Sequence, residues 1–196
     1  MSIRATGGVG YLPLNEWTDF ARAGADNYRK ERFGAYWDIG IFCSFARRHA
    51  VGLTVGGIGI TAYDSGSVAP YYSYRTQWDF KTAPVTLVYE FYFSRSNCRF
   101  TPFIGAGVSY LITDLEVTHK SIGEPYGLET SVVTGDGEGY GFQGYLGLRS
   151  QITPSFFLVS RMRGQYADGW GFTRKKGDVK IEFTGADIAL GLECRF

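Results

Sequence analysis

The residues whose types and spacing most clearly suggest catalysis are a histidine and a serine two positions apart, in the stretch His119-Lys120-Ser121. A serine hydroxyl beside a histidine base and an acid is the arrangement that performs acyl transfer. In an extended segment, residues two apart share a face, so His119 and Ser121 can be neighbours. We favour a solvated polar loop instead, because a triad must meet several independent geometric requirements. Acids close by in the sequence are Asp114, Glu116, Glu124 and Glu129.

Residue types that bind metals or form redox pairs show no recognisable pattern. Cys43, Cys98 and Cys194 are odd in number and lack a C-x-x-C spacing, which argues against a zinc site or a disulfide framework. Whether any two of them pair is left open. The acidic stretch 135–139 is rich in glycine but lacks the ligand spacing of a calcium loop. We therefore expect no metal and no cofactor.

A third group of chemically capable residues consists of charges within stretches that alternate in polarity. A buried charge is tolerated only when it is paired and hydrogen-bonded, so these residues predict either an ion-pair network or the lining of a polar pore. Their signs nearly balance. The group comprises Arg4, Asp38, Glu90, Arg149, Arg161, Arg163, Asp187, Glu193 and Arg195.

The elements that position these charges are read most easily from the last stretch, Lys180–Phe196. From Thr184 on, every second residue is apolar or small, and three of the intervening residues, Asp187, Glu193 and Arg195, are charged. Strict alternation is the period of a β-strand. A soluble sandwich strand and a transmembrane barrel strand both fit this one segment.

Eight such alternating segments run along the chain, and their connections alternate in length. Three connections are short, 47–49, 94–100 and 153–155, and four are long and polar, 13–32, 64–79, 114–138 and 167–179. Short turns at one end and long loops at the other are typical of an up-and-down barrel of the outer-membrane type. Within the loop 114–138 we expect a hairpin extension over Glu116–Thr134. The predicted strands are roughly Ile3–Leu12, Phe33–Ala46, Ala50–Tyr63, Phe80–Phe93, Thr101–Thr113, Gly139–Ile152, Phe156–Tyr166 and Lys180–Phe196.

Charges in these segments are predicted to fall on one face of the sheet. The positions of opposite parity are apolar, as in Trp37, Ile39 and Ile41 of the second segment. A lysine or arginine facing lipid near the bilayer midplane costs about 2–4 kcal/mol, so a membrane would enforce this separation. A soluble lipocalin-like barrel needs the reverse, with polar residues outside. We therefore expect lipid outside and the charges in the lumen.

Aromatic residues on the lipid-facing parity gather at both ends of the segments. This placement predicts two aromatic girdles at the membrane interfaces, although tyrosine and phenylalanine are also good strand formers. The tyrosines lie toward the long loops and the phenylalanines toward the short turns. The residues are Tyr11, Phe45, Tyr63, Phe91, Phe93, Tyr110, Tyr140, Phe156, Tyr166 and Phe196.

Closure of the sheet follows from the same hypothesis. An open edge in hydrocarbon would leave a row of backbone groups unpaired, so the last strand must pair with the first. An eight-stranded interior is nearly filled by side chains, which favours a lumen plugged by the charged residues over a gated pore. Inward glycines would make room for large arginine and tyrosine side chains.

Composition supports one β-rich domain over residues 1–196. Aromatic residues make up 17% and glycine numbers 27, and no uncharged run reaches the roughly 18 residues of a membrane helix. The net charge of +1 gives no reason to expect nucleic-acid binding. No secretory leader is visible before the first alternating segment, so we expect a mature chain, the alternative being a cytoplasmic protein.

The stretches Thr101–Tyr110 and Gly7–Tyr11 and the terminal Phe196 resemble the small outer-membrane β-barrel proteins. The group is typified by the transmembrane domain of outer membrane protein A and by outer membrane protein W. This resemblance implies the outer membrane of a Gram-negative cell, contact with lipopolysaccharide, exposed loops and assembly by machinery that recognises a C-terminal strand ending in Phe196. The resemblance to outer membrane protein W also allows a channel for hydrophobic ligands with a lateral exit.

The functional expectation is a non-enzymatic, monomeric barrel with a structural, surface-interaction or small-solute passage role. The rival is an outer-membrane lipid A acyl hydrolase using Ser121 and His119. Some eight-stranded barrels are lipid A deacylases with a His-x-Ser motif, which His119-Lys120-Ser121 resembles. In that family asparagine follows the serine, whereas Ile122 stands here, so the match is partial.

Overall fold

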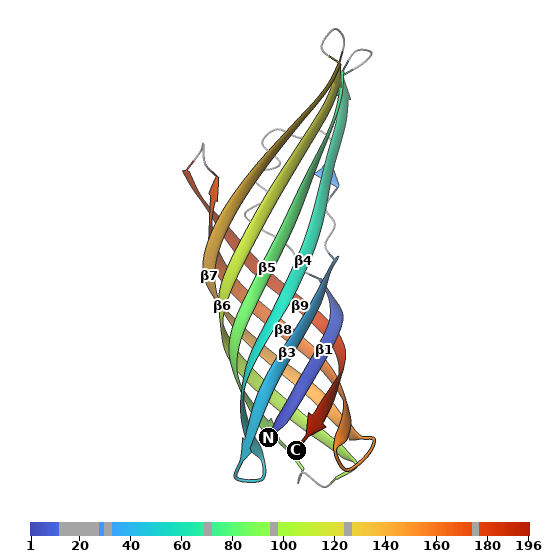
Figure 1. Ribbon diagram of the computed structural model, residues 1–196, viewed down its shortest axis with the longest axis vertical. Coiled ribbons are helices and arrows are strands. Elements are labelled where there is room, and N and C mark those ends of the chain that lie inside the picture. The colour runs from blue at the N-terminus through green and yellow to red at the C-terminus, as the bar shows by residue number, and fades with distance from the viewer. Residues whose placement is uncertain (12–27, 30–32, 69–71, 95–97, 124–126, 174–176) are drawn as a thin grey trace.

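The predicted alternation forms long antiparallel strands in the computed structural model of the protein (Figure 1). The structure describes residues 1–11, 28–29, 33–68, 72–94, 98–123, 127–173 and 177–196. In this described part, eight long strands accompany one two-residue strand, β2. They are β1 (Ser2–Tyr11), β2 (Tyr28–Arg29), β3 (Phe33–Phe45), β4 (His49–Val68), β5 (Tyr72–Tyr92), β6 (Phe100–Gly123), β7 (Gly127–Gln151), β8 (Phe156–Thr173) and β9 (Gly177–Arg195).

The eight long strands close into a barrel. Their order around the sheet is β4-β3-β1-β9-β8-β7-β6-β5, and β4 also pairs with β5, which removes both edges. The predicted pairing of the last strand with the first is confirmed, with Ala5 opposite Leu192 in the β1–β9 ladder. Both chain ends lie at the short-turn end of the barrel (Figure 1).

In the barrel, the described side chains alternate between a filled interior and an exposed exterior, whereas residues 128–132 at the top of β7 are all exposed. In β1 the residues Ser2, Arg4 and Thr6 are buried, and their neighbours Ile3 and Ala5 are exposed. Two buried apolar clusters occupy the interior. The cluster near the short turns comprises Phe42, Ala50, Val88, Tyr92, Phe103, Tyr145 and Val159, and the one toward the long loops Ile60, Phe80, Leu111, Leu115 and Ala167.

The outer surface carries the apolar side chains that a water-soluble barrel would bury. Trp37 is 53% exposed and Leu190 60% exposed, and similar residues continue around the barrel. Large contiguous apolar surface on a monomer marks contact with a partner or a membrane. Among the described residues, no helix has the length and hydropathy needed to span a membrane.

The strands extend well beyond the predicted boundaries toward the long loops. β6 and β7 remain paired from Phe100↔Ser150 to Gly123↔Gly127, which confirms the predicted hairpin extension over Glu116–Thr134. The predicted loop 64–79 is also largely a hairpin, because β4 and β5 pair up to Val68↔Tyr72. As a result, β4 to β7 form a sheet that rises above the rest of the barrel (Figure 1).

Among the side chains that the structure describes, one charge contradicts the prediction that all charges within the spans face inward. Lys81, inside the predicted strand Phe80–Phe93, is exposed on the outer face and lies opposite the exposed Asp114 of β6. The next outward residues toward the short turns are Ala83 and Val85. Lys81 therefore stands at the upper boundary of the apolar surface, where a bilayer would impose little penalty on a charge.

Candidate functional site in the barrel interior

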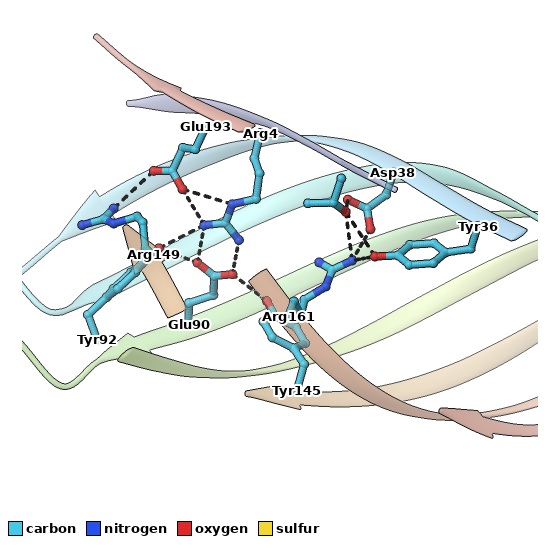
Figure 2. Close-up of polar contacts among 10 residues, drawn as sticks. Arg4, Tyr36, Asp38, Glu90, Tyr92, Tyr145, Arg149, Arg161 and Glu193 are labelled. Carbon is cyan, nitrogen blue, oxygen red and sulfur yellow. Dashed lines mark hydrogen bonds and ion pairs between the residues drawn. The ribbon is translucent and has the colours of Figure 1, made fainter. Parts of the chain in front are cut away.

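Arg4 is the centre of a charged cluster near the short-turn end of the lumen (Figure 2). Its Nη1 donates to Glu90 Oε1 at 2.5 Å and its Nη2 to Glu90 Oε2 at 3.0 Å. Its Nε and Nη2 donate to Glu193 Oε2 at 3.1 and 2.8 Å. Arg4 is 1% exposed, so one guanidinium holds two fully desolvated carboxylates, which are stronger partners than neutral groups.

The second positive charge and two tyrosines complete this cluster. Arg149 Nη1 donates to Glu193 Oε1 at 3.2 Å, so two arginines balance two glutamates. Tyr92 Oη and Tyr145 Oη donate to Glu90 at 2.5 and 2.9 Å. The carboxylate of Glu90 thus accepts hydrogen bonds from three side chains, which meets the requirement that a buried charge be paired and bonded.

A second set of ion pairs lies further toward the long loops. Arg161 donates to Asp38 and to the hydroxyl of Tyr36 (Figure 2). Arg163 Nε donates to Asp187 Oδ2 at 2.7 Å, and its guanidinium lies 4.2 Å from the ring centroid of Tyr36. Two further pairs of opposite charge are therefore buried in the same lumen.

Inward glycines make the space for the large interior side chains. A Cβ at Gly105 would lie 2.3 Å from the Tyr145 ring, and one at Gly147 would lie 2.4 Å from the Phe103 ring. Each ring therefore packs directly against the backbone of a neighbouring strand. This arrangement brings the Tyr145 hydroxyl to Glu90.

The interior toward the long loops is less completely bonded than the Arg4 cluster. In the described part of the molecule, Arg161 Nε, Arg163 Nη2 and Asp187 Oδ1 are buried without a hydrogen-bond partner, as is Arg149 Nε nearer the short turns. Arg4 and Glu90 have no buried side-chain nitrogen or oxygen that lacks a hydrogen-bond partner. The tightest bonding thus sits near the short-turn end.

The structure brings eight of the nine predicted interior charges into ion pairs and leaves one apart. Arg195 is half-buried at the short-turn end, and no ion pair joins it to any residue of the described part. Whether the paired residues close the lumen to solutes stays a prediction.

The predicted girdle residues lie on the outer face wherever their side chains are described. Tyr110 and Tyr140 face each other across β6 and β7 with ring centroids 5.5 Å apart, and Phe91 and Phe93 are 5.4 Å apart. The side chain of Tyr63 lies outside the described part of the molecule. Exposed or half-buried are Tyr11, Phe45, Phe91, Phe93, Tyr110, Tyr140, Phe156, Tyr166 and Phe196. Their role as membrane girdles remains a prediction.

The structure does not favour the hydrolase hypothesis. His119 Nδ1 is 2.9 Å from Thr76 Oγ1, and its ring stacks on Tyr74 with a centroid distance of 6.1 Å. Ser121 is buried, and no hydrogen bond joins it to His119 in the described part of the chain. Nor do any three His, Cys, Asp or Glu side chains among the described residues share a metal-binding arrangement.

One feature of the barrel wall was not predicted from the sequence. The β4–β5 ladder is continuous on both sides of Gly56-Gly57 and Ala83-Pro84, but these residues do not pair. Proline has no N–H to donate, so Pro84 in a predicted strand was the available signal. A groove of about 420 Å³ lies at the interruption, and its lining includes Trp37, Gly57 and Lys81.

Comparison with known proteins supports the fold alone. No protein-family model and no curated protein sequence matches the chain. Neisserial surface protein A shares 14% identity, with 100% of this chain and 96% of that chain covered and a TM-score of 0.53. Outer membrane protein OprG of Pseudomonas aeruginosa shares 15% identity, with 100% and 95% covered and a TM-score of 0.54.

A major outer membrane protein from Thermus thermophilus is similar to the same degree. It shares 13% identity, with 99% of each chain covered and a TM-score of 0.51. The chain therefore has the fold of the small outer-membrane β-barrel proteins.

Proposed function

We propose that the chain is an integral protein of a bacterial outer membrane whose lumen is closed near the short turns by the Arg4 cluster. The observation that carries this proposal is the reach of Arg4 across the interior. Arg4 lies on β1 and bonds Glu90 on β5, and these two strands are not neighbours in the barrel. Side chains from separate parts of the wall therefore meet across the interior, which supports a lumen closed at this level.

The orientation follows from the two ends of the barrel. The short turns and both chain ends would face the periplasm, and the tall β4–β7 sheet would stand outside the cell among lipopolysaccharide. The strand β9 and Phe196 would present the signal for the barrel-assembly machinery. A closed sheet leaves no edge within the wall for pairing with another copy, so we propose a monomer.

Gel mobility and conductance test the two parts of the proposal separately. The folded protein should require detergent and should migrate differently on unboiled and boiled gels. Purified protein in planar bilayers should show no steady conductance. The double variant Arg4→Ser with Glu90→Ser should open measurable current, whereas Lys81→Ser, which alters a charge outside the lumen, should not.

Two results would contradict the two parts of this proposal. A monodisperse protein in water without detergent would exclude the membrane assignment. A steady open channel in the unmodified protein would exclude the closed lumen while leaving the membrane assignment intact.

The interrupted β4–β5 ladder favours a second role, the passage of small apolar solutes through the wall above the closed level. The outer groove and a small cavity of about 20 Å³ share Ile58 and Thr82 in their linings, so both spaces border these two side chains. The small cavity is lined largely by apolar groups, including Leu111 and Ala167. A solute entering from the long-loop end would be stopped by the Arg4 cluster and would lie beside the interrupted β4–β5 ladder.

Pro84→Val tests this role, because valine supplies the missing N–H and can extend the ladder. The variant should slow the entry of an apolar fluorescent dye into cells with an intact lipopolysaccharide leaflet. Pro102→Val is the matched control, since Pro102 lies on β6 away from the interruption. Dye entry that is equal for Pro84→Val and the unmodified protein would exclude the lateral route.

A further inference from the structure

Exposed charged side chains at the short-turn end of the barrel are of one sign. The sequence contains no acidic residue in the segments 44–50, 93–101, 150–156 or 194–196. The two glutamates of the lower barrel, Glu90 and Glu193, are buried in the Arg4 cluster. We define the basic rim as the arginines described at this end, namely Arg47, Arg48, Arg99 and Arg195.

The opposite end of the molecule carries charges of both signs, with carboxylates in excess among the described exposed side chains. The exposed cations described there are Arg75, Lys81 and Lys120, and the exposed carboxylates are Asp114, Glu116, Glu129, Asp136 and Glu138. The molecule is therefore polar along its long axis although its net charge is only +1. This separation indicates that the two ends meet surfaces of different charge.

The basic rim is without internal anionic partners. Within the described part of the chain, no ion pair involves Arg47, Arg48, Arg99 or Arg195. By contrast, Arg4, Arg149, Arg161 and Arg163 in the lumen are all paired. The rim guanidiniums are available to an external anion, and their planar forks suit a phosphate.

The turn between β3 and β4 presents two of these arginines in an unusual backbone. Ala46 and Arg47 both have positive φ, at 50° and 58°. Asn-Gly is the common choice for such positions, and other residues there carry a conformational cost. The turn is closed by the pair Phe45↔His49, so Arg47 and Arg48 project from the end of the hairpin.

An aromatic surface lies directly beside this turn on the outer face. The His49 ring lies 5.6 Å from the ring of Phe45 and 5.3 Å from that of Phe91, between centroids. His49 Nδ1 is 2.6 Å from the hydroxyl of Tyr89. Aromatic rings with arginines just beyond them match the interface between acyl chains and phosphates.

Backbone hydrogen bonds connect the rim around the barrel. Tyr92 N–H donates to Arg48 O at 2.8 Å, and Gln151 N–H donates to Arg99 O at 2.8 Å. Arg195 N–H donates to Ser155 O, also at 2.8 Å. The arginines are thus carried on a connected ring of turns and strand ends that a flat surface can meet at several points.

We propose that the basic rim binds the phosphates of anionic phospholipids in the leaflet at the short-turn end. The proposal rests on the membrane assignment made above. Charge complementarity selects an anionic headgroup over a zwitterionic one, because the cationic group of a zwitterionic lipid would be repelled by the arginines of the basic rim. Each arginine near an anionic surface should strengthen binding about fivefold.

The test uses the full chain, folded in neutral detergent micelles, with phosphatidylglycerol or phosphatidylcholine added in increasing amounts. Lipid binding raises the midpoint of thermal unfolding, and the concentration dependence of that shift reports the apparent affinity. The unmodified protein should bind phosphatidylglycerol at least about tenfold more tightly than phosphatidylcholine. Arg47→Gln with Arg48→Gln should remove most of this preference. Lys81→Gln, a cation at the other end, should keep it.

A second variant, Arg99→Gln, lies outside the strained turn and covers the case in which the double variant does not fold. Arg99→Gln should weaken the preference about fivefold. Equal binding of both lipids by the unmodified protein would overturn the proposal, as would a full preference retained in both arginine variants. In those cases an intact gel shift would leave the membrane assignment standing, whereas loss of the detergent requirement would remove both.

Discussion

Arg4 shows how much of the interior depends on single residues. It is buried with Glu90 and Glu193, and its guanidinium also lies 4.1 Å from the ring centroid of Phe42. A buried ion pair is weakly stabilising compared with an apolar replacement of the whole pair, but removal of one partner leaves an uncompensated charge. The Arg4 cluster is therefore sensitive to the loss of its cation.

Arg4→Met should lower the free energy of unfolding by about 3–5 kcal/mol, because it leaves two buried glutamates with fewer cationic partners. Urea unfolding of the folded barrel in micelles measures this change. Addition of Glu90→Gln to Arg4→Met should recover part of the loss by removing one unpaired charge. The matched control is Arg195→Met, which removes a half-buried arginine outside the ion pairs. A loss for Arg4→Met no larger than for Arg195→Met would contradict the assigned role.

Sequence parity could predict which face each charge takes, but it could not predict the partners. Arg4 and Glu90 are separated by 86 positions in the chain and lie on strands that are not adjacent. Their meeting depends on the height of each residue in the closed barrel, which is set by the strand stagger. Arg195 has the same parity as Glu193 but lies closer to the end, where no acidic side chain among the described residues forms an ion pair with it.

At the scale of elements, the β1–β9 ladder closes the barrel and depends on close backbone approach. A Cβ at Gly191 would lie 2.1 Å from the carbonyl oxygen of Ala5 and 2.6 Å from Thr6 Cγ2. The oxygen belongs to the backbone of β1, so relief of the clash requires the strands to separate. A Cβ at Gly144, on the outer face of β7, would have no heavy atom within 4 Å.

Gly191→Ala should destabilise the barrel by about 1–3 kcal/mol through overpacking. Gly144→Ala should change stability by no more than about 0.5 kcal/mol, since the added methyl group points into open space. Urea midpoints in micelles and the fraction of protein in the fast-migrating gel band measure both effects. Similar values for the two variants would show that the β1–β9 ladder adapts to a side chain at Gly191.

Strand existence was predictable, whereas strand length was not. Within the apolar belt one face is lipid-facing and the other is packed, so polarity alternates and the period is visible in Trp37 to Ile41. Beyond the belt the outward residues become polar as well, as at Glu116 and Lys120 in β6. The contrast between faces is lost there, and a paired strand looks like a loop.

At the scale of the whole molecule, the barrel and the tall β4–β7 sheet differ in what must be packed and paired for each to be stable. The Arg4 cluster and the apolar cluster around Phe103 lie toward the short turns, and β1, β3 and β9 do not reach the upper sheet (Figure 1). Closure of the barrel was expected from the need to pair every backbone group in lipid. No such need determines the part above the belt, where water can bond open edges.

Replacement of Glu116–Thr134 by Asn-Gly should therefore leave the barrel folded. Leu115 and Gly135 face each other in the β6–β7 ladder, so a two-residue turn of the type common in hairpins can join them. The shortened protein should keep its gel shift, because the Arg4 cluster and the lower apolar cluster stay intact. Its free energy of unfolding should fall by about 1–3 kcal/mol, because Val117, which packs on the upper apolar cluster, is removed. A variant in which only residues 124–126 are replaced by Asn-Gly controls for the new turn. If the long deletion abolishes the gel shift and the short one does not, the upper hairpin is required for barrel formation, and the two parts of the molecule fold as one cooperative unit.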